Sequence, residues 1–147
     1  PKVFNQIIGQ GHSIGNHTFN HVNGWQTNAL DYYENVRRCE REIASHGLTE
    51  PARVKLFRPP YGRVTRKQIK TLPDYKIVMW DVLSVDYNKN LLPEKCLKNT
   101  IAATRAGSII VFHDSFKAEK NLVFALPRFM EHFSQQGFVF RKLKFEV

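Results

Sequence analysis

Two recurring spacings of hydrophobic residues run along this chain. Apolar residues three or four positions apart predict helices, and short dense apolar runs predict strands. The clearest helix covers residues 28–46, and one face of it carries Tyr32, Val36, Cys39 and Ile43. Further helices are predicted at 3–10, 65–71, 93–105 and 119–136, and strands at 13–16, 54–57, 76–80, 108–112 and 138–143. Because strands and helices alternate, the pattern predicts a parallel α/β fold.

Polar side chains that can take part in catalysis or metal binding follow several of the predicted strands. His17 follows one strand, Arg58 the next, Asp81 a third and His113 a fourth. In open α/β sheets and in barrels, sites form at the carboxyl ends of the strands. We therefore expect these four residues to lie at one rim of the fold.

Composition narrows the class of protein. The 147 residues are 42% hydrophobic, which suits one domain spanning residues 1–147. The formal net charge is +9, but the basic residues are scattered, so a solvated basic surface is favoured and no nucleic-acid partner is expected. No apolar run is long enough to cross a membrane. Cys39 and Cys96 lie far apart and are expected to be free, buried thiols.

His17 and His21 form the most informative pair in the sequence. Three residues separate them, so both rings can face one ion if the segment makes a helical turn or a tight loop. A catalytic zinc normally takes three protein ligands and a water. The pair is therefore two thirds of a metal site, although two histidines at this spacing, taken alone, are more often structural.

Residues 58–62, Arg-Pro-Pro-Tyr-Gly, make a stiff turn. The prolines fix the backbone, so the N–H of Tyr61 can be held toward a developing oxyanion. Arg58 can pair with a carboxylate and keep it ionised. The competing interpretation is an ordinary surface turn with a solvated arginine.

The last two candidate segments carry acid–base chemistry. Asp86 can hold a histidine in one tautomer, and His113, at the end of a buried strand, is a candidate general acid. Trp80 and Tyr87 can form an apolar wall on which a sugar stacks. Taken singly, these residues are core aromatics, a capping aspartate and a structural histidine. Their convergence with the two earlier segments favours a site.

These four segments, in this order, resemble the motifs of the polysaccharide deacetylases, the NodB homology domain of carbohydrate esterase family 4. Residues 11–21 are similar to the second motif and residues 58–62 to the third. Residues 84–87 resemble the fourth, with Tyr87 where tryptophan is usual, and residues 109–113 the fifth, with Val111 where leucine is common. The resemblance covers essentially the whole chain.

The resemblance implies a distorted (β/α) barrel and a divalent metal, usually zinc, that is held by one Asp and two His. It implies that His17 and His21 bind the metal and that Thr18 braces their loop. Arg58 would position the catalytic base, and Tyr61 would give its N–H to the oxyanion. His113 would protonate the leaving amine, tuned by Asp86. The substrate would be an acetylated polysaccharide outside the cytoplasm, in the envelope, the periplasm or the medium.

One departure from the family pattern sets the expectation for this chain. The first family motif supplies the base Asp and the metal Asp, and neither Asp nor Glu occurs among the sixteen residues before His17. We expect an incomplete barrel without its first strands and helix, an aspartate ligand upstream of residue 1, and weak or no activity of the isolated chain. Asp81 and Asp114 are poor substitutes.

The sequence is compatible with three functions. The first is hydrolysis of N-acetyl groups on N-acetylglucosamine polymers by the parent enzyme, with peptidoglycan ahead of chitin and O-acetylated xylan last. The second is a non-catalytic glycan-binding module with the same fold. The third is a basic protein that binds nucleic acid or the cell envelope, whose binding would weaken steeply with salt.

Overall fold

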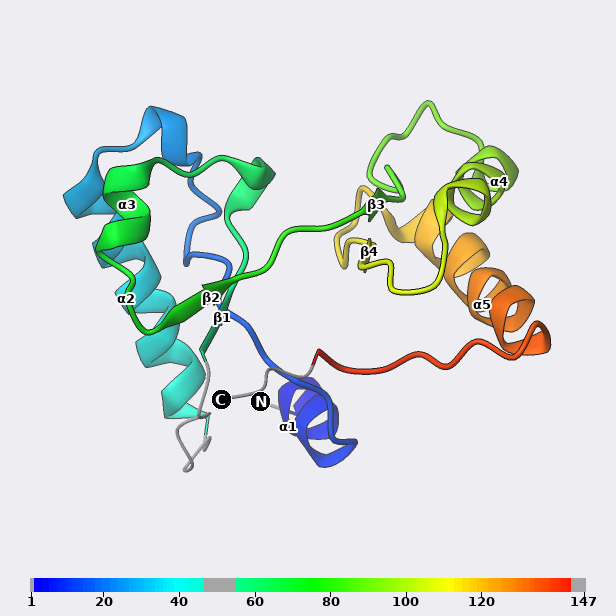
Figure 1. The fold of residues 1–147 in the computed structure, drawn as a ribbon, viewed down its shortest axis with the longest axis horizontal. Helices are drawn as coiled ribbons and strands as arrows, with labels where there is room; N and C mark the ends of the chain where they lie inside the picture. Colours follow the sequence, from blue (N-terminus) through cyan, green and yellow to red (C-terminus); the bar gives the residue numbers. More distant parts are fainter. Residues whose placement is uncertain (1, 47–54, 144–147) are drawn as a thin grey trace. The chain divides into compact units, whose positions relative to one another are not determined.

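The chain divides into two compact units in the computed structural model, which describes residues 2–46 and 55–143. The first unit comprises Pro1–Met79 with Lys142–Val147, and the second comprises Trp80–Arg141. Figure 1 labels their helices and strands. The expectation of a single domain stays a prediction.

The first unit is built on a short parallel sheet. Its elements are α1 (Lys2–Gly9), η1 (Gly24–Gln26), α2 (Ala29–Ser45), β1 (Lys55–Phe57), η2 (Pro60–Gly62), α3 (Arg66–Lys70) and β2 (Tyr75–Ile77). β1 pairs with β2 in parallel, with Lys55 opposite Tyr75 and Phe57 opposite Ile77. Asn16 adds a parallel bridge to Phe57 on the other side of the pairing. The residues that follow Asn16 and Phe57 therefore leave the sheet at the same edge.

Local sequence signals explain the helices of this unit. Asn28 caps α2 by accepting a hydrogen bond from the N–H of Asp31. Thr65 and Gln68 form a reciprocal capping box at the start of α3. The core between these helices and the sheet consists of Tyr32, Val36, Phe57 and Leu72. Burial of the Tyr32 hydroxyl raises its pKa to about 12.

Glu40 ties α2 to both strands of the sheet. Its carboxylate pairs with Lys55 of β1 at 2.6 Å and accepts a hydrogen bond from the hydroxyl of Tyr75 of β2. Burial alone would raise the pKa of Glu40, but the hydrogen bonds from Lys55 and Tyr75 outweigh burial and lower it. These contacts fix the position of α2 against the sheet from which the segments at 17–21 and 58–62 emerge.

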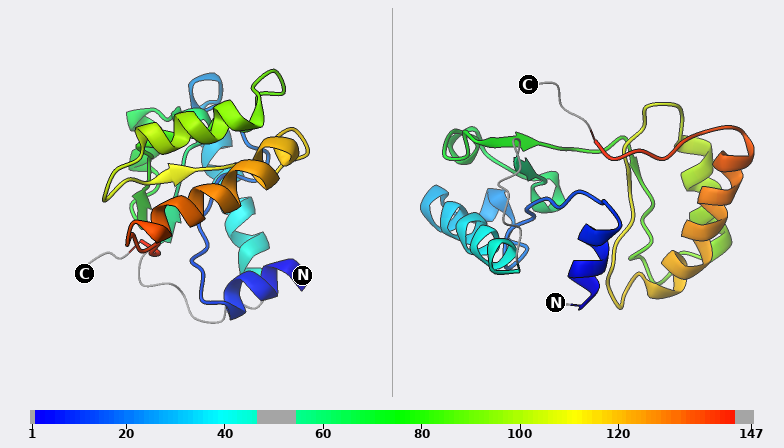
Figure 2. Two further views of the ribbon diagram at one scale, coloured as in Figure 1. Left: turned by 90° about the vertical axis from the view of Figure 1, so that its right-hand side faces the viewer. Right: turned by 90° about the horizontal axis from the view of Figure 1, so that it is seen from below.

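The second unit repeats the same arrangement on a smaller scale. It contains β3 (Val82–Leu83), α4 (Pro93–Ala103), β4 (Ile110–Val111) and α5 (Glu119–Gln135). β3 and β4 are parallel, with Val82 opposite Ile110. α4 and α5 lie side by side in the views of Figure 2, and α4 starts with a proline in its first turn. The core consists of Val82, Cys96, Val111, Ala118, Ala125, Phe129 and Phe133.

The helices agree with the sequence analysis, but several strands do not. Residues 13–16 contribute only the bridge at Asn16, the strand expected at 76–80 is Tyr75–Ile77, and 138–143 form no strand. An apolar run becomes a strand only when a neighbour pairs with its backbone, and the described residues give 138–143 no such partner. Val54, the first residue of another expected strand, lies outside the described residues.

Both units are parallel α/β structures, as the alternation of strands and helices predicts. The closed barrel implied by the family resemblance stays a prediction. In the described part of the chain, no helix combines the length and the apolar character that a membrane span requires. Cys96 is a buried free thiol as expected, whereas Cys39 is free but only half-buried.

Candidate active site

His17 and Arg58 meet at the edge of the first unit where both of their segments leave the sheet. The Nδ1 atom of His17 lies 2.5 Å from the carbonyl oxygen of Arg58. A carbonyl can only accept, so this contact puts the ring proton on Nδ1 and the lone pair on Nε2. That is the tautomer a metal-binding histidine needs, with the second nitrogen oriented by a backbone carbonyl.

His21 stands next to His17 and to the proline-rich turn. The two imidazole rings have centroids 4.9 Å apart and meet edge to face. On its other side His21 packs against the ring of Tyr61, with centroids 4.8 Å apart. The structure thus brings His17, His21 and the turn of residues 58–62 together, as the sequence analysis expects.

Among the residues that the structure describes, four that are not glycine adopt left-handed backbone angles, and all four lie within residues 11–21, 58–62 or 84–87. Their φ values are 61° for Thr18, 53° for His21, 59° for Tyr61 and 57° for Val85. This region costs a non-glycine residue about 1–2 kcal/mol. Strain concentrated in these segments means that surrounding contacts must hold them in place.

Two buried residues, Asn16 and Thr18, support the loop of residues 17–21, called the histidine loop below. The buried side chain of Asn16 donates to the carbonyl of Val36 on α2 at 2.9 Å and accepts from the N–H of Thr18 at 2.9 Å. The hydroxyl of Thr18 then accepts from the N–H of Val22 at 3.1 Å. The bracing role expected for Thr18 has this contact as its physical basis, and Asn16 adds a link to the helix below.

Asn35 on α2 holds the same loop from outside, and the sequence analysis missed it. Its side-chain oxygen accepts from the N–H of Asn20 at 2.8 Å, and its backbone carbonyl accepts from the N–H of Phe19 at 3.2 Å. The guanidinium of Arg38 lies 3.8 Å from the centroid of the Phe19 ring. No local sequence pattern signals these contacts, because they join residues 15 to 19 positions apart.

Replacing Asn35 with alanine is expected to weaken metal binding by about two- to tenfold, because one hydrogen bond that holds the strained loop is lost. Asn35→Asp keeps the accepting oxygen and should retain most of the affinity. Glu34→Ala, at an exposed neighbouring position of the same helix, is the matched control. Zinc titration followed on the histidine NMR signals measures the effect. Equal affinities for Asn35→Ala and Glu34→Ala would remove Asn35 from the loop's support.

The side chain of Arg58 turns toward the end of β2. Its Nε atom donates to the carbonyl of Val78 at 3.1 Å, and its Nη2 atom to the carbonyl of Met79 at 3.3 Å. Burial lowers the pKa of this guanidinium. These bonds leave further N–H groups of the planar fork with which Arg58 can position a carboxylate.

The neighbouring turn leaves the N–H of Tyr61 out of its own hydrogen bonds. Its internal hydrogen bonds use the N–H groups of Gly62 and Arg63, which donate to Pro59 and Pro60, and do not use that of Tyr61. Tyr61 is 60% exposed. This geometry suits the oxyanion role expected for the Tyr61 N–H.

Asp86 and His113 form a tight pair in the second unit. One carboxylate oxygen of Asp86 lies 2.6 Å from Nδ1 of His113, and the other accepts from the backbone N–H of His113 at 2.8 Å. Burial alone would raise the pKa of Asp86, but these hydrogen bonds outweigh it and lower the pKa. Asp86 is therefore ionised at neutral pH and orients the half-exposed His113 ring through Nδ1.

Other residues fix this pair from behind. Asn121 of α5 donates to the carbonyl of Asp86 at 2.9 Å, and the N–H of Asp86 approaches the hydroxyl of Ser84 at 3.4 Å. Tyr87, 40% exposed, meets the His113 ring edge to face at 4.9 Å between centroids. Tyr87 thus forms a wall beside His113, and Asn121 is a supporting residue that sequence reasoning missed.

The remaining candidates have weaker support. Trp80 is half-buried at the start of the second unit, so its sugar-stacking role stays a prediction. Asp81 accepts from the N–H of Ile109 at 2.8 Å, which gives it a structural task next to β4.

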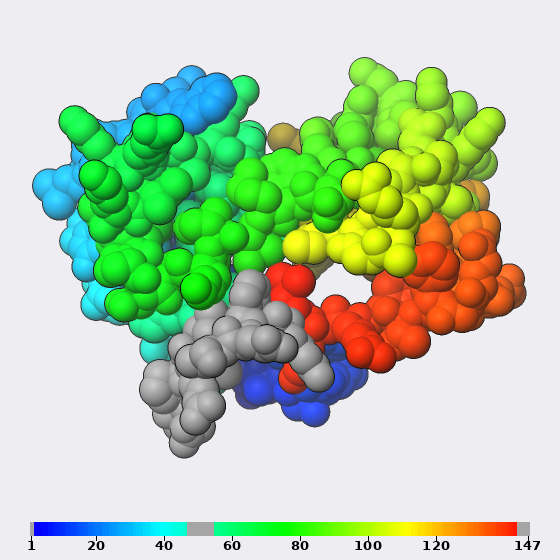
Figure 3. All heavy atoms as spheres, viewed as in Figure 1, coloured from blue at the N-terminus to red at the C-terminus, as the bar shows by residue number. Residues whose placement is uncertain are grey.

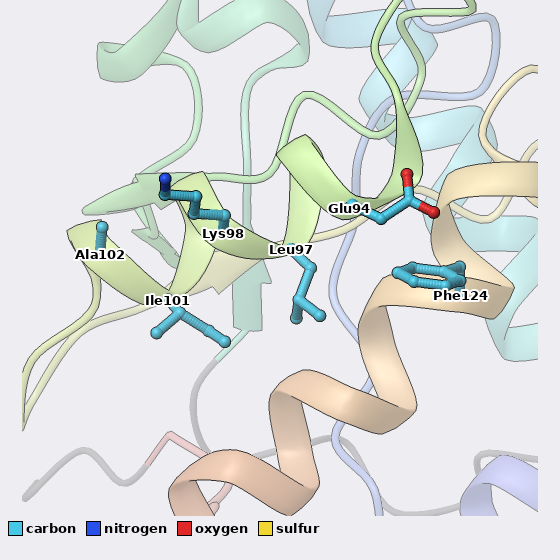
Figure 4. A pocket seen from close by; sticks show the side chains of 6 residues that line it. All are labelled: Glu94, Leu97, Lys98, Ile101, Ala102 and Phe124. Carbon is cyan, nitrogen blue, oxygen red and sulfur yellow. The ribbon is translucent and has the colours of Figure 1, made fainter.

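A cavity of about 420 Å³ lies between α4 and α5 (Figure 4). It is lined by Glu94, Leu97, Lys98, Ile101, Ala102 and Phe124, none of which belongs to the motif segments.

The histidine loop fits a divalent metal as part of a ligand set. His17 has the required tautomer, and His21 stands beside it. Within residues 2–46 and 55–143, no three His, Cys, Asp or Glu side chains are grouped to hold a metal ion. A metal site that uses His17 and His21 would need a third ligand in addition to this pair.

Comparison with known proteins shows the family of this chain. A family model described as polysaccharide deacetylase matches residues 1–80. The chain belongs to the polysaccharide deacetylase family. The matched residues contain the two segments at 11–21 and 58–62.

Two of the relatives that the chain resembles are named for different glycans. The chain is 31% identical over 117 residues to a peptidoglycan-N-acetylglucosamine deacetylase of Bacillus cereus, a match that covers 78% of this chain and 41% of that protein. It is 25% identical over 155 residues to a chitooligosaccharide deacetylase of Sinorhizobium fredii, and this match covers 97% of this chain and 71% of that protein. A crystal structure of a peptidoglycan N-acetylglucosamine deacetylase, 29% identical, has a TM-score of 0.84 and matches 97% of this chain and 66% of that one.

The chain spans less than half of the Bacillus cereus relative in the first of these matches.

Proposed function

We propose that this chain supplies the metal-binding histidines, the oxyanion-binding turn and the proton-donating histidine for hydrolysis of N-acetyl groups on an N-acetylglucosamine polymer. Peptidoglycan is the preferred substrate, ahead of chitin, and the protein acts outside the cytoplasm. The hydrogen bond from His17 Nδ1 to the Arg58 carbonyl carries the proposal, because it prepares Nε2 for a metal.

Each residue has a separate task in the proposed reaction. When bound, a divalent metal such as zinc polarises the acetyl carbonyl and supplies a nucleophilic water. The N–H of Tyr61 stabilises the charge that develops on the carbonyl oxygen. Arg58 positions the carboxylate that serves as base. His113, oriented by Asp86, gives a proton to the departing amine from Nε2.

A carboxylate from outside the described residues completes the proposed metal site. The isolated chain is accordingly expected to bind zinc weakly and to have little or no activity. This shortfall also supports the alternative, a glycan-binding module without catalysis. Acetate release separates the two proposals.

Joining this chain to the segment of the Bacillus cereus relative that it does not span is expected to give zinc-dependent release of acetate from N-acetylglucosamine oligomers. A chelator should abolish release, and His17→Ala should do the same, because one of two histidine ligands is lost. Calorimetry of the isolated chain with zinc should show weak binding. A tight one-to-one zinc site in that chain, or an active His17→Ala variant, would refute the proposed ligand set.

A further inference from the structure

Trp25 is a large aromatic side chain that the proposed reaction does not use. It lies in η1, four residues after His21, and is 66% exposed. Asn23 caps the turn by accepting from the N–H of Trp25 at 3.0 Å. Figure 3 shows the segment around η1 at the surface of the first unit. An exposed tryptophan on a well-capped turn is a feature of binding surfaces.

A buried side chain clamps this turn onto the start of α3. Gln68 is 1% exposed, and its amide nitrogen donates to the carbonyls of Gly24 and Thr27, both at 2.8 Å. Its amide oxygen accepts from the N–H of Thr65 at 2.8 Å. A side chain at position 24 would collide with the carbonyl oxygen of Arg63, so glycine permits the close approach. Trp25 is therefore presented on a rigid support.

Arg63 completes the surface beside Trp25. Its guanidinium carbon lies 4.9 Å from the centroid of the indole ring, within the range of a cation–π contact. Arg63 is exposed, and no ion pair between described residues involves it. The guanidinium thus keeps N–H donors for an external anion, and a carboxylate matches its fork.

This Trp25–Arg63 pair lies close to the metal-binding loop along the chain. Arg63 is two residues from Tyr61, whose ring packs on His21. If one sugar of a glycan is bound at the histidines, the adjoining sugars have to lie on the surface beside them. The indole suits the apolar face of a pyranose ring, and the guanidinium suits an acidic substituent on it.

We propose that Trp25 and Arg63 form a subsite for an acid-bearing sugar next to the sugar that is deacetylated. This inference rests on the proposed function and specifies its substrate. Chitin contains neutral N-acetylglucosamine alone, whereas peptidoglycan alternates it with N-acetylmuramic acid, which carries a lactyl carboxylate or an acidic stem peptide. The subsite therefore selects peptidoglycan strands over chitin.

The test measures binding of short oligosaccharides to the chain in the presence of a chelator. The probes are chitotetraose, a peptidoglycan tetrasaccharide with free lactyl carboxylates, its neutral methyl ester, and the tetrasaccharide with stem peptides. The unaltered chain should bind one or both acidic probes about three- to fivefold more tightly than the neutral ones. The two acidic probes distinguish lactyl from peptide carboxylates.

Two variants and a matched control assign the preference to its residues. Arg63→Gln should remove the preference for acid and leave chitotetraose binding unchanged. Trp25→Ala should weaken binding of every probe by about tenfold. Arg66→Gln, which removes an exposed charge of α3, should have no effect. Equal losses for Arg63→Gln and Arg66→Gln, or unchanged binding in a folded Trp25→Ala variant, would overturn the subsite.

The outcome is separable from that of the deacetylation assay. Because binding is measured without metal, a preference that depends on Arg63 supports the subsite even if the completed protein releases no acetate. Acetate release without any acid preference would retain the reaction and reject the subsite.

Discussion

Replacing His113 with alanine is expected to lower kcat for deacetylation by about 10²- to 10⁴-fold, the range that a positioned general acid contributes. Asp86 holds the ring by Nδ1 at 2.6 Å, so a proton can leave only from Nε2. Because the proton moves in the transition state, KM should change far less than kcat. The measurement is steady-state acetate release by the completed deacetylase described above.

Two comparisons make this prediction specific. Tyr87→Phe keeps the aromatic wall beside His113 and should leave kcat within about threefold, since only an exposed hydroxyl is removed. His113→Gln retains hydrogen bonding without proton transfer and should behave like the alanine variant. A His113→Ala enzyme with normal kcat would remove His113 from the acid role.

Replacing Asp86 with asparagine is expected to lower the free energy of unfolding by about 2–3 kcal/mol. Asp86 is fully buried, and its two oxygens accept from Nδ1 and from the backbone N–H of His113. Asparagine has only one accepting oxygen, so one donor would face an amide. Urea unfolding at pH 7 measures the loss. Asp81→Asn is the control, because an exposed amide oxygen can still accept from Ile109, and it should cost less than about 0.5 kcal/mol.

The same variant carries a signature in pH. The pKa of Asp86 is lower in the folded chain than in the unfolded chain. Its contribution to stability is therefore complete above the unfolded pKa, near 4, and is lost as the pH falls through the folded pKa. The stability gap between the parent chain and Asp86→Asn should narrow as the pH falls below about 4. A gap that stays constant as the pH falls through the folded pKa of Asp86 would show that the carboxylate's charge contributes nothing.

The helices were predictable from sequence because their signals are local. An apolar face at helical spacing, Asn28 before α2, Thr65 before α3 and Pro93 at the start of α4 all act within a few residues. Strands were harder, because pairing partners decide them. The two-residue strand β3 was missed, and the apolar segment 138–143 was wrongly expected to be a strand.

The candidate site residues could be named from the sequence because their chemistry is visible there, whereas the residues that support them could not. His17, Arg58, Asp86 and His113 follow the ends of parallel segments, and the structure joins them in two local pairs. Asn35, Gln68 and Asn121 reach across 15 to 44 positions of sequence to hold loops or turns. Nothing in the spacing of apolar residues marks such polar contacts in advance.

At His21, with its left-handed backbone, selection for stability and selection for metal binding favour different residues. Glycine would adopt φ 53° without strain, so it would make the loop cheaper to fold. It would also delete one of the two proposed metal ligands. Directed evolution for heat resistance alone is therefore expected to favour glycine at position 21 at the expense of metal binding. A homologue with glycine at this position is expected to lack the proposed reaction.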